Sequence, residues 1–436
     1  MATSDPSPSA SASATAAAAA GNTALRLHFV GTGTSTALPV APCLAEVDKP
    51  SRDVGFFLDD YKASEDKAPA HWAGYDPSAA WPASVACSSC RAAVDRRVAS
   101  GWKNRRGNPG LVLRKRDTGG QWRNVVVDVG KTFREQSCKL FPRWGIKRID
   151  AVLITHGHAD AYNGLDDLRE WCNRQGSGIP VYLSKATFET VAASFPYLVD
   201  KTKATGGHDL PTLEFKIIDD ESEFVVEGIT VTTLPVHHGR YFNATPAAAP
   251  APSAPGTPVP GTPAQPTPFI CLGYVFDRSI VLLSDVSSVP DQTWKRLEAA
   301  LDGEQLPVLI VDALWPWRPH ASHVSWIQAM EIALRIKASI TYVLGMTHPT
   351  THWQWEELGR SIRGEDGREP EHDTHRLTQK LISEVWAHED MGKIADGLRE
   401  WKGVVEPAFD GLGLEIDHGQ YHVLADGQGS TGGWDL

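Results

Sequence analysis

The sequence predicts an α/β protein in which two β-sheets pack face to face and helices cover the outside. Three observations support this fold class. Short β-branched runs recur along the chain, amphipathic helices separate them into groups, and the composition (42% hydrophobic, 22% charged) is that of a soluble globular protein. The length of 436 residues allows one large layered domain with insertions.

Nine segments have the apolar, β-branched composition of strands. The first also shows the alternation of a half-buried strand, because polar residues separate Leu25, Leu27 and Phe29. Asp277 and Arg278 are typical of a tight turn between two paired strands. The expected strands are residues 25–30, 124–128, 151–155, 181–184, 229–235, 272–276, 280–284, 308–312 and 340–345.

Two helices are predicted between these groups of strands. In residues 164–174 the apolar side chains recur at helical spacing, and Gly176 marks the expected end. Residues 325–337 open with Ser325-x-x-Gln328, a capping box that satisfies the first backbone N–H groups of a helix. Strands, helix, strands and helix in this order favour a sheet-on-sheet sandwich with helices outside.

The core is predicted to be one domain, residues 23–422, with surface insertions. Residues 1–22 are mostly Ser, Ala, Thr and Pro and are expected to be a disordered leader, with the features of neither a secretory signal peptide nor a mitochondrial presequence. The expected compartment is therefore the cytoplasm or nucleus, and no apolar run is long enough for a transmembrane helix. Insertions are expected at about 46–84, 244–268 and 354–404, and a flexible tail at 423–436.

The charge balance disfavours one class of partner, and the cysteines exclude one class of scaffold. The chain has 42 Lys and Arg against 53 Asp and Glu, a formal net charge of −11. This balance argues against a protein that coats nucleic acid through phosphate contacts. Six scattered cysteines are too few for a disulfide scaffold, and Cys87-Ser-Ser-Cys90 indicates metal or redox chemistry in a reducing compartment.

The strongest chemical signal follows the expected strand at 151–155. The sequence His156-Gly157-His158-Ala159-Asp160 offers two imidazoles and a carboxylate from one short loop. Zinc accepts this mixture of nitrogen and oxygen ligands readily, so the motif predicts a metal site. Histidines are common in loops, and the motif alone leaves an ordinary loop as the alternative.

Three more candidate ligands occur in the same context. His238, Asp285 and His348 each follow a run of apolar, strand-forming residues. Strand ends are where layered folds display functional groups. Each of these residues taken singly can be an ordinary loop residue, but the repeated context predicts that they join His156 and His158 in one site.

With these motifs in this order, the sequence resembles the metallo-β-lactamase superfamily over about residues 25–353, with a last strand near 413–416. The family pattern is His-x-His-x-Asp-His followed by a His, an Asp and a His, each at a strand end. The resemblance implies a four-layer αβ/βα sandwich with surface insertions and a two-metal centre. Carried over by position, it implies His156, His158 and His238 on the first metal, Asp160 and His348 on the second, and Asp285 as the bridge.

Three positions refine this assignment. Ala161 stands where most family members have a histidine that binds the second metal, which weakens the expected second site. His238 is preferred to the adjacent His237 as the ligand, because the family histidine precedes a glycine. Asp128 matches an early family aspartate that supports the metal loop without binding metal.

A glycine-rich loop and three cysteines resemble one branch of the superfamily. Residues 29–39 are similar to the opening loop of tRNA 3′-end endonucleases (tRNase Z) and of the PhnP family of phosphoribosyl cyclic phosphodiesterases, although such a loop is either an anion site or a tight turn. In the PhnP branch three cysteines and a histidine hold a structural zinc. Here that zinc would be held by Cys43, Cys87, Cys90 and His352. Residues 106–108, 131–136 and 165–169 also resemble stretches of eukaryotic members, and their charged side chains either line a phosphate cleft or form solvated surface.

The resemblance implies a metal-dependent hydrolase, and within that class a phosphodiesterase acting on a small cyclic phosphate or nucleotide-like phosphodiester through a metal-activated water. Its expected cofactors are one or two catalytic ions, zinc or manganese, and one structural zinc. His323 matches a family histidine near the leaving group and is a candidate general acid, with a surface histidine at a helix start as the alternative. Asp160 is the other candidate catalytic residue.

Other functions are also consistent with the sequence. A tRNase Z-like nuclease acting on RNA ends is disfavoured by the acidic charge and the lack of an obvious basic arm. A metal-binding protein with little activity is suggested by Ala161 and the large insertions, and thioester hydrolysis is disfavoured by the opening loop and the cysteines. The expected partner is a small phosphodiester substrate, with no membrane; a homodimer is left open.

Overall fold

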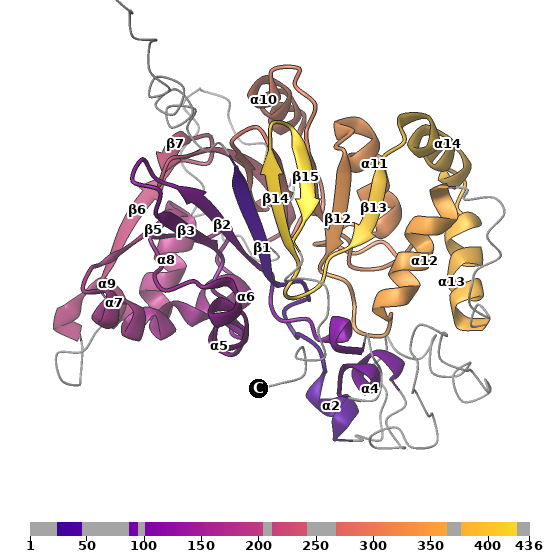
Figure 1. Cartoon of the computed structure of the whole chain (residues 1–436). Helices are drawn as coiled ribbons and strands as arrows, with labels where there is room; N and C mark the ends of the chain where they lie inside the picture. Colours follow the sequence, from indigo (N-terminus) through magenta and orange to yellow (C-terminus); the bar gives the residue numbers. More distant parts are fainter. Residues whose placement is uncertain are drawn as a thin grey trace, which may run out of the picture.

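Two β-sheets face each other at the centre of the molecule (Figure 1). A computed structural model describes residues 24–45, 87–94, 101–203, 212–241, 267–363 and 376–424. Within these ranges the first sheet has eight strands, in the order β15 (Gln420–Val423), β14 (Gly413–Asp417), β1 (Leu25–Gly31), β2 (Gly110–Arg116), β3 (Trp122–Val127), β4 (Ala151–Leu153), β5 (Ile179–Ser184) and β6 (Leu213–Ile218). The second has seven, in the order β13 (Val404–Pro407), β12 (Ile340–Leu344), β11 (Val308–Asp312), β10 (Ile280–Leu283), β9 (Pro268–Phe276), β8 (Ile229–Arg240) and β7 (Glu223–Val226).

Strand direction determines where the loops of the sandwich gather. Strands β3 to β6 pair in parallel in the first sheet, and β10 to β13 pair in parallel in the second. Parallel strands of one sheet end on the same side, and that side is where α/β folds place their ligands. The loops that follow β4, β10, β11 and β12 carry candidate ligands, and His238 lies near the end of β8. Each sheet therefore presents candidate ligands along one edge.

The inner faces of the two sheets form one apolar core. Leu27 and Phe29 of β1 are fully buried in it, together with Leu272 and Tyr274 of β9 and Ile310 of β11. The alternation predicted for the first strand is therefore confirmed, because its apolar side chains face the other sheet. None of the candidate metal ligands in the described ranges belongs to this core, so a change at the site should leave the packing between the sheets intact.

Helices cover both outer faces, which gives the predicted four-layer αβ/βα sandwich (Figure 1). Helices on the first sheet are α5 (Phe133–Trp144), α6 (Ala159–Tyr162), α7 (Arg169–Gln175), α8 (Lys185–Ser194) and α9 (Pro196–Val199), with the 3-10 turns η4 (Asn163–Leu168) and η5 (Lys201–Lys203). Helices on the second sheet are α10 (Asp291–Leu301), α11 (Trp326–Ile336), α12 (His352–Arg363), α13 (Arg376–Trp386) and α14 (Met391–Trp401). Near the ends of the strands lie α2 (Ala41–Leu44), α4 (Ser88–Val94) and the 3-10 turn η3 (Gly101–Asn104). No helix within the described ranges is long and apolar enough to cross a membrane.

Several expected boundaries change in the structure. The capping box at Ser325 and Gln328 is confirmed at the start of α11. The strand expected to end at residue 235 continues to Arg240, and the helix expected from residue 164 begins as a 3-10 turn. The described part of 354–404 is helical, and its apolar residues are buried in the outer layer of the second sheet. The expected leader, the insertion at 46–84, and most of the 244–268 insertion and of the tail lie outside the described residues.

Candidate metal centre

Three histidines converge at the edge of the sandwich. The Nε2 atom of His238 lies 3.1 Å from the Nδ1 atom of His158, and one ring nitrogen from each of His156, His158 and His238 falls within 4.8 Å of the others. Nitrogen ligands of a tetrahedral zinc at 2.0–2.1 Å lie about 3.3 Å apart. His156 and His238 are buried and His158 is exposed, so the cluster opens to solvent on the His158 side.

Hydrogen bonds set the ring orientation of His156. Asp128 accepts two of them from Thr155, from the backbone N–H and from the hydroxyl, each at 2.8 Å. Because the Thr155 hydroxyl donates to Asp128, it accepts from Nδ1 of His156 at 2.8 Å. The Nε2 atom of His156 therefore carries the lone pair, and it is buried without a hydrogen-bond partner among the described residues. Asp128 thus supports the histidine cluster through Thr155. The resemblance implied such a supporting role, without metal binding, for this aspartate.

His238 is held in the same way. Its Nδ1 atom lies 2.7 Å from the backbone carbonyl of Ser322, so Nδ1 donates and Nε2 presents a lone pair to His158. Burial lowers the pKa of His156 to about 3, and burial together with neighbouring His238 lowers the pKa of His158 to about 4. Both imidazoles are therefore neutral near pH 7, the form that binds metal. An orphaned buried nitrogen beside two others at this spacing fits a divalent metal ion.

Replacing Thr155 with valine should weaken metal binding about 10- to 100-fold, the usual effect of losing a partner that orients a metal-binding histidine. Valine has the shape of threonine but cannot accept the Nδ1–H of His156. Competition with a chromophoric chelator measures the change in metal affinity. Thr155→Ser keeps the hydroxyl and should bind as tightly as the parent. Equal affinity of the valine and serine variants would contradict this role.

Asp285 lies on the other side of His238. One carboxylate oxygen accepts a hydrogen bond from the Ser284 hydroxyl at 2.9 Å, and the other lies 3.7 Å from Nδ1 of His323. A ligand atom from each of His238, Asp285 and His323 falls within 4.8 Å of the others. Burial alone would raise the pKa of Asp285, but the nearby His156, His238 and His323 hold it below its ordinary value. Asp285 is therefore a carboxylate beside the three imidazoles.

His323 is paired with an aspartate that the sequence analysis missed. Nδ1 of His323 lies 2.7 Å from a carboxylate oxygen of Asp312, the last residue of β11. Burial lowers the pKa of His323, but the charge and hydrogen bond of Asp312, with Asp285, raise it overall to about 9. Asp312 could have been found from the sequence, because it is a polar residue at the end of an apolar run, like the histidines and Asp285.

Asp160 and Ala161 are the residues of the metal loop that the family pattern assigns to the second metal. Asp160 is buried, and burial together with the charge of Asp285 raises its pKa to about 6. The metal loop packs so closely on Gly130 that a Cβ atom there would lie 1.9 Å from the backbone oxygen of Asp160. Ala161 is 1% exposed and has no donor atom in its side chain. Of these two residues, only Asp160 therefore offers a side-chain atom that could bind a second metal ion.

A second cluster of candidate ligands forms where α2 and α4 meet the loop after β12. One ligand atom from each of Cys43, Cys87 and His348 falls within 4.8 Å of the others, and Nε2 of His348 lies 3.7 Å from Sγ of Cys43. Cys90 is also in this cluster, where its sulfur accepts a hydrogen bond from the backbone N–H of Val40 at 3.3 Å. Hydrogen bonds from the Cys87 and Cys90 thiols hold the pKa of Cys43 well below its ordinary value.

The structure differs from the expected placement of two histidines. His348, expected beside Asp160 and Asp285, lies with the cysteines. His352, expected with the cysteines, is buried at the start of α12, where its Nε2 atom lies 3.2 Å from Glu356 one turn later on the same helix face. The backbone N–H of His352 donates to Asn104 at 2.8 Å, and Nδ1 of its ring is buried without a hydrogen-bond partner among the described residues.

The glycine-rich opening loop serves packing. The backbone N–H of Gly33 donates to the carbonyl of Gly107 at 2.7 Å, and a Cβ atom on Gly33 would lie 2.7 Å from the carbonyl oxygen of Arg106. The hydroxyl of Thr32 donates to buried Asp410 at 2.8 Å, and Asp410 also accepts from the backbone of Gly107. Of the two interpretations of this loop, the tight turn is the one that these contacts favour.

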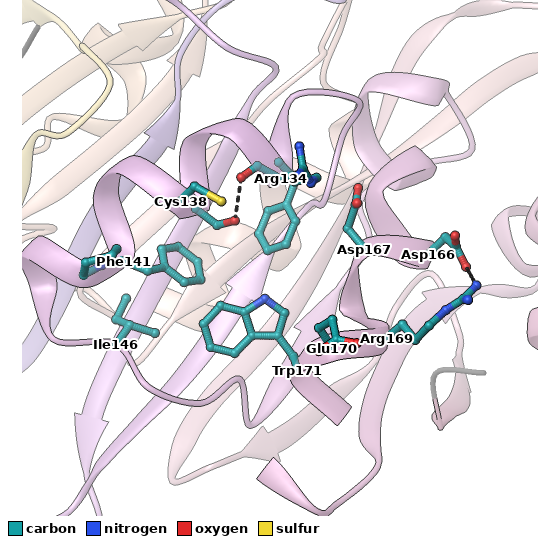
Figure 2. A pocket seen from close by; sticks show the side chains of 12 residues that line it. Arg134, Cys138, Phe141, Ile146, Asp166, Asp167, Arg169, Glu170 and Trp171 are labelled. Atoms are coloured by element: carbon teal, nitrogen blue, oxygen red, sulfur yellow. Dashed lines mark hydrogen bonds and ion pairs between the residues drawn. The ribbon is translucent and has the colours of Figure 1, made fainter. Parts of the chain in front are cut away.

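The charged stretches at 131–136 and 165–169 line a pocket of about 410 Å³ between α5, η4 and α7 (Figure 2). Its floor contains Phe141 and Trp171, and its rim carries three carboxylates and two guanidinium groups. Arg169 pairs with Asp166 at 3.0 Å. The excess of carboxylates argues against a phosphate cleft. The histidine cluster takes no part in lining this pocket.

Two aromatic residues flank the histidines. Phe269 of β9 stacks on His158, with ring centroids 4.6 Å apart and planes 5° from parallel. Tyr241, which follows β8, packs edge-on against Phe269 at 5.3 Å and is 46% exposed. Neither residue stands out in the sequence, because both adjoin the proline-rich segment. Together they form an aromatic wall on the open side of the cluster.

Comparisons with known proteins agree with this fold. The family model for the beta-lactamase superfamily domain matches residues 123–346, more than half of the chain. The structure of a diphosphatase from the PhnP family is 22% identical with a TM-score of 0.52, over 92% of this chain and 99% of that one. YhfI from Bacillus subtilis, a metallo-β-lactamase fold protein, is 13% identical with a TM-score of 0.45, over 90% and 99% of the two chains.

A curated relative shares a shorter segment. An octanoyltransferase from Porphyromonas gingivalis (strain ATCC BAA-308 / W83) is 32% identical over 118 residues, which is 27% of this chain and 22% of that protein. The match thus spans about a fifth of that relative's length. The match to the family model, together with a four-layer sandwich carrying its histidine cluster at a strand edge, shows that the chain belongs to the metallo-β-lactamase superfamily of metal-dependent hydrolases.

Proposed function

We propose that this hydrolase is a phosphodiesterase that cleaves a small cyclic phosphate or nucleotide-like phosphodiester. The observation that carries the proposal is the placement of the His323–Asp312 pair beside the His156, His158 and His238 cluster. The cluster fits a divalent cation, and the pair offers a proton donor next to it. Hydrolysis of a phosphodiester with a poor leaving group needs both functions.

Each group in the site has a separate role in this proposal. The three histidines and Asp285 would hold a divalent metal ion, which would supply Lewis acidity toward a phosphoryl oxygen and lower the pKa of a bound water. Asp160 is a buried carboxylate near Asp285 and accepts the proton that the attacking water loses. As the bond from phosphorus to the leaving oxygen breaks, His323 donates a proton to that oxygen. Asp312 holds Nδ1 of His323, so Nε2 is the donating atom.

Several features favour a small substrate. The net charge of −11 disfavours a long nucleic acid, whose binding depends on many phosphate contacts. The aromatic wall formed by Phe269 and Tyr241 suits one planar ring placed beside the phosphate. The PhnP-family diphosphatase that shares the fold acts on a phosphate compound, which is consistent with this class.

Replacing Tyr241 with alanine should raise KM for a 2′,3′-cyclic nucleotide by about tenfold, because base–aromatic stacking is worth about 1–3 kcal/mol. KM for glycerol 1,2-cyclic phosphate, which has no base, should stay unchanged. Steady-state kinetics on both substrates measure the difference. Tyr241→Phe keeps the ring and serves as the control. An equal rise in KM for both substrates would show that Tyr241 does not contact a base.

A substrate panel tests the function itself. The full chain, loaded with zinc or with manganese, is assayed on bis-p-nitrophenyl phosphate, 2′,3′-cyclic nucleotides, a precursor tRNA and an octanoyl thioester. We expect turnover of the small phosphodiesters and an intact precursor tRNA. Cleavage of the tRNA 3′ end would favour the nuclease instead, and turnover confined to the thioester would overturn phosphodiester chemistry. If the chain binds metal but turns over none of these substrates, the result would favour a metal-binding protein with little activity.

A further inference from the structure

The pocket between α5, η4 and α7 takes no part in the proposed chemistry (Figure 2). Its volume of about 410 Å³ is within the range of about 300–1,000 Å³ that is typical of small-molecule sites. It combines an apolar floor with charged side chains at its rim. Which ligand it suits depends on which of those charges are already paired.

The floor of the pocket is aromatic and aliphatic. Phe141 and Ile146 are 1% and 5% exposed, and the ring of Trp171 packs edge-on against Phe141 with centroids 5.6 Å apart. Trp171 itself is only partly buried and lines the pocket. A large apolar group placed on this floor would remove aromatic surface from water, which favours binding.

Two of the three carboxylates at the rim are already paired. Asp166 pairs with Arg169 at 3.0 Å on the turn between η4 and α7. Glu170 pairs with Arg174 at 3.2 Å, one turn later on α7. These two pairs are electrically neutral, so neither offers a full charge to a ligand.

Asp167 and Arg134 remain, as one carboxylate and one guanidinium. Both side chains are exposed and line the pocket, Asp167 from η4 and Arg134 from α5, and Figure 2 shows them beside each other. They are farther apart than the 4.0 Å of an ion pair, and neither pairs with another charged side chain in the described part of the chain. Partial burial raises the pKa of Asp167 and the charge of Arg134 opposes that rise, so the two charges are close enough to interact.

This pair of charges suits a ligand that carries one charge of each sign. A simple anion would be repelled by Asp167, and a simple cation would be repelled by Arg134. We propose that the pocket binds a free α-amino acid with a large apolar side chain. Its ammonium group donates to Asp167, its carboxylate accepts two hydrogen bonds from Arg134, and its side chain lies on Trp171. The proposal goes beyond the function of the histidine cluster, whose residues do not line this pocket.

Isothermal titration calorimetry of the full chain with L-phenylalanine tests the proposal. Three analogues each lack one feature: 3-phenylpropionate has no ammonium group, L-phenylalaninamide has no carboxylate, and glycine has no apolar side chain. Each should bind about tenfold more weakly than L-phenylalanine or worse, because each loses a hydrogen bond to a charged group or the contact with the floor.

Variants of the exposed rim residues assign each contact. Asp167→Asn should weaken L-phenylalanine about tenfold and should no longer distinguish it from 3-phenylpropionate. Arg134→Gln should weaken it by a similar factor and should no longer distinguish it from the amide. Glu170→Gln is the matched control, because this carboxylate is already paired with Arg174, and it should bind as tightly as the parent.

The same titrations can overturn the proposal. Amino acids also bind metal ions, so equal binding by the parent and Asp167→Asn would place L-phenylalanine at a metal ion and not in this pocket. Equal affinities for L-phenylalanine and 3-phenylpropionate in the parent would show that the ligand class is wrong, as would the absence of any binding. A loss in Glu170→Gln as large as in Asp167→Asn would show a general effect of rim charge.

Discussion

Replacing His156 with alanine is expected to lower kcat/KM for bis-p-nitrophenyl phosphate by at least about 10³-fold, because activation of water by a bound metal would be lost. His156 presents a buried nitrogen that has no hydrogen-bond partner among the described residues. Its removal leaves two histidines, of which His158 is exposed. The fold should survive, because the core between the sheets is built from aliphatic and aromatic residues such as Leu27 and Phe29.

The chain contains a matched control for this prediction. His237 adjoins a cluster histidine in sequence, but its Nδ1 atom lies 3.2 Å from the hydroxyl of Ser288, and its backbone pairs with the same residue. His237→Ala should therefore keep turnover within a few-fold of the parent. Kinetics are compared at equal bound metal, with circular dichroism to check the fold. Near-parent turnover of His156→Ala would remove this residue from the metal centre, and equal losses in both variants would point to a general effect on β8 and its surroundings.

The sequence predicted most of the catalytic cluster because one simple rule applies to it. His156, His238 and Asp285 are polar residues at or near the ends of apolar strands. Strands β8 and β10 both run antiparallel to β9 and therefore share a direction, so His238 and Asp285 come to one edge of the second sheet. The fold followed from the same strands together with the capped helix at Ser325. Strand β2 was missed because its second half, Arg114-Lys115-Arg116, has the composition of exposed surface.

The rule fails where long-range contacts decide the geometry. His348 and His352 are four residues apart, and both follow the same strand. Their separation into different environments depends on Arg106, which binds the carbonyls around His348, and on Glu356, which faces His352. Arg106 and the loop it holds are about 240 residues apart, so no local pattern encodes this choice. Family position alone assigned the two histidines the other way round.

Replacing His323 with asparagine is expected to lower kcat by about 10² to 10⁴-fold for a 2′,3′-cyclic nucleotide, the usual contribution of a general acid. The leaving group of a 2′,3′-cyclic nucleotide is an alkoxide, which must be protonated as the bond to phosphorus breaks. The loss should be much smaller for bis-p-nitrophenyl phosphate, because p-nitrophenolate leaves without a proton. Asp312→Asn should also lower kcat for the cyclic nucleotide more than kcat for bis-p-nitrophenyl phosphate. Both losses should be smaller than those of His323→Asn, because Asp312 acts by holding Nδ1 of His323.

The difference between the two substrates separates proton donation from metal binding. A ligand atom of His323 lies within 4.8 Å of those of His238 and Asp285, so the same residue has the position of a metal ligand. A ligand's loss would slow both substrates equally and lower bound metal. A proton donor's loss slows only the substrate with the poor leaving group and leaves bound metal at the parent level. His320→Asn, in which a histidine of the same loop 5.3 Å from His323 is changed, should slow neither substrate. The pKa of His323, raised to about 9 by Asp312 and Asp285 against the effect of burial, keeps it protonated at neutral pH, the state that proton donation requires.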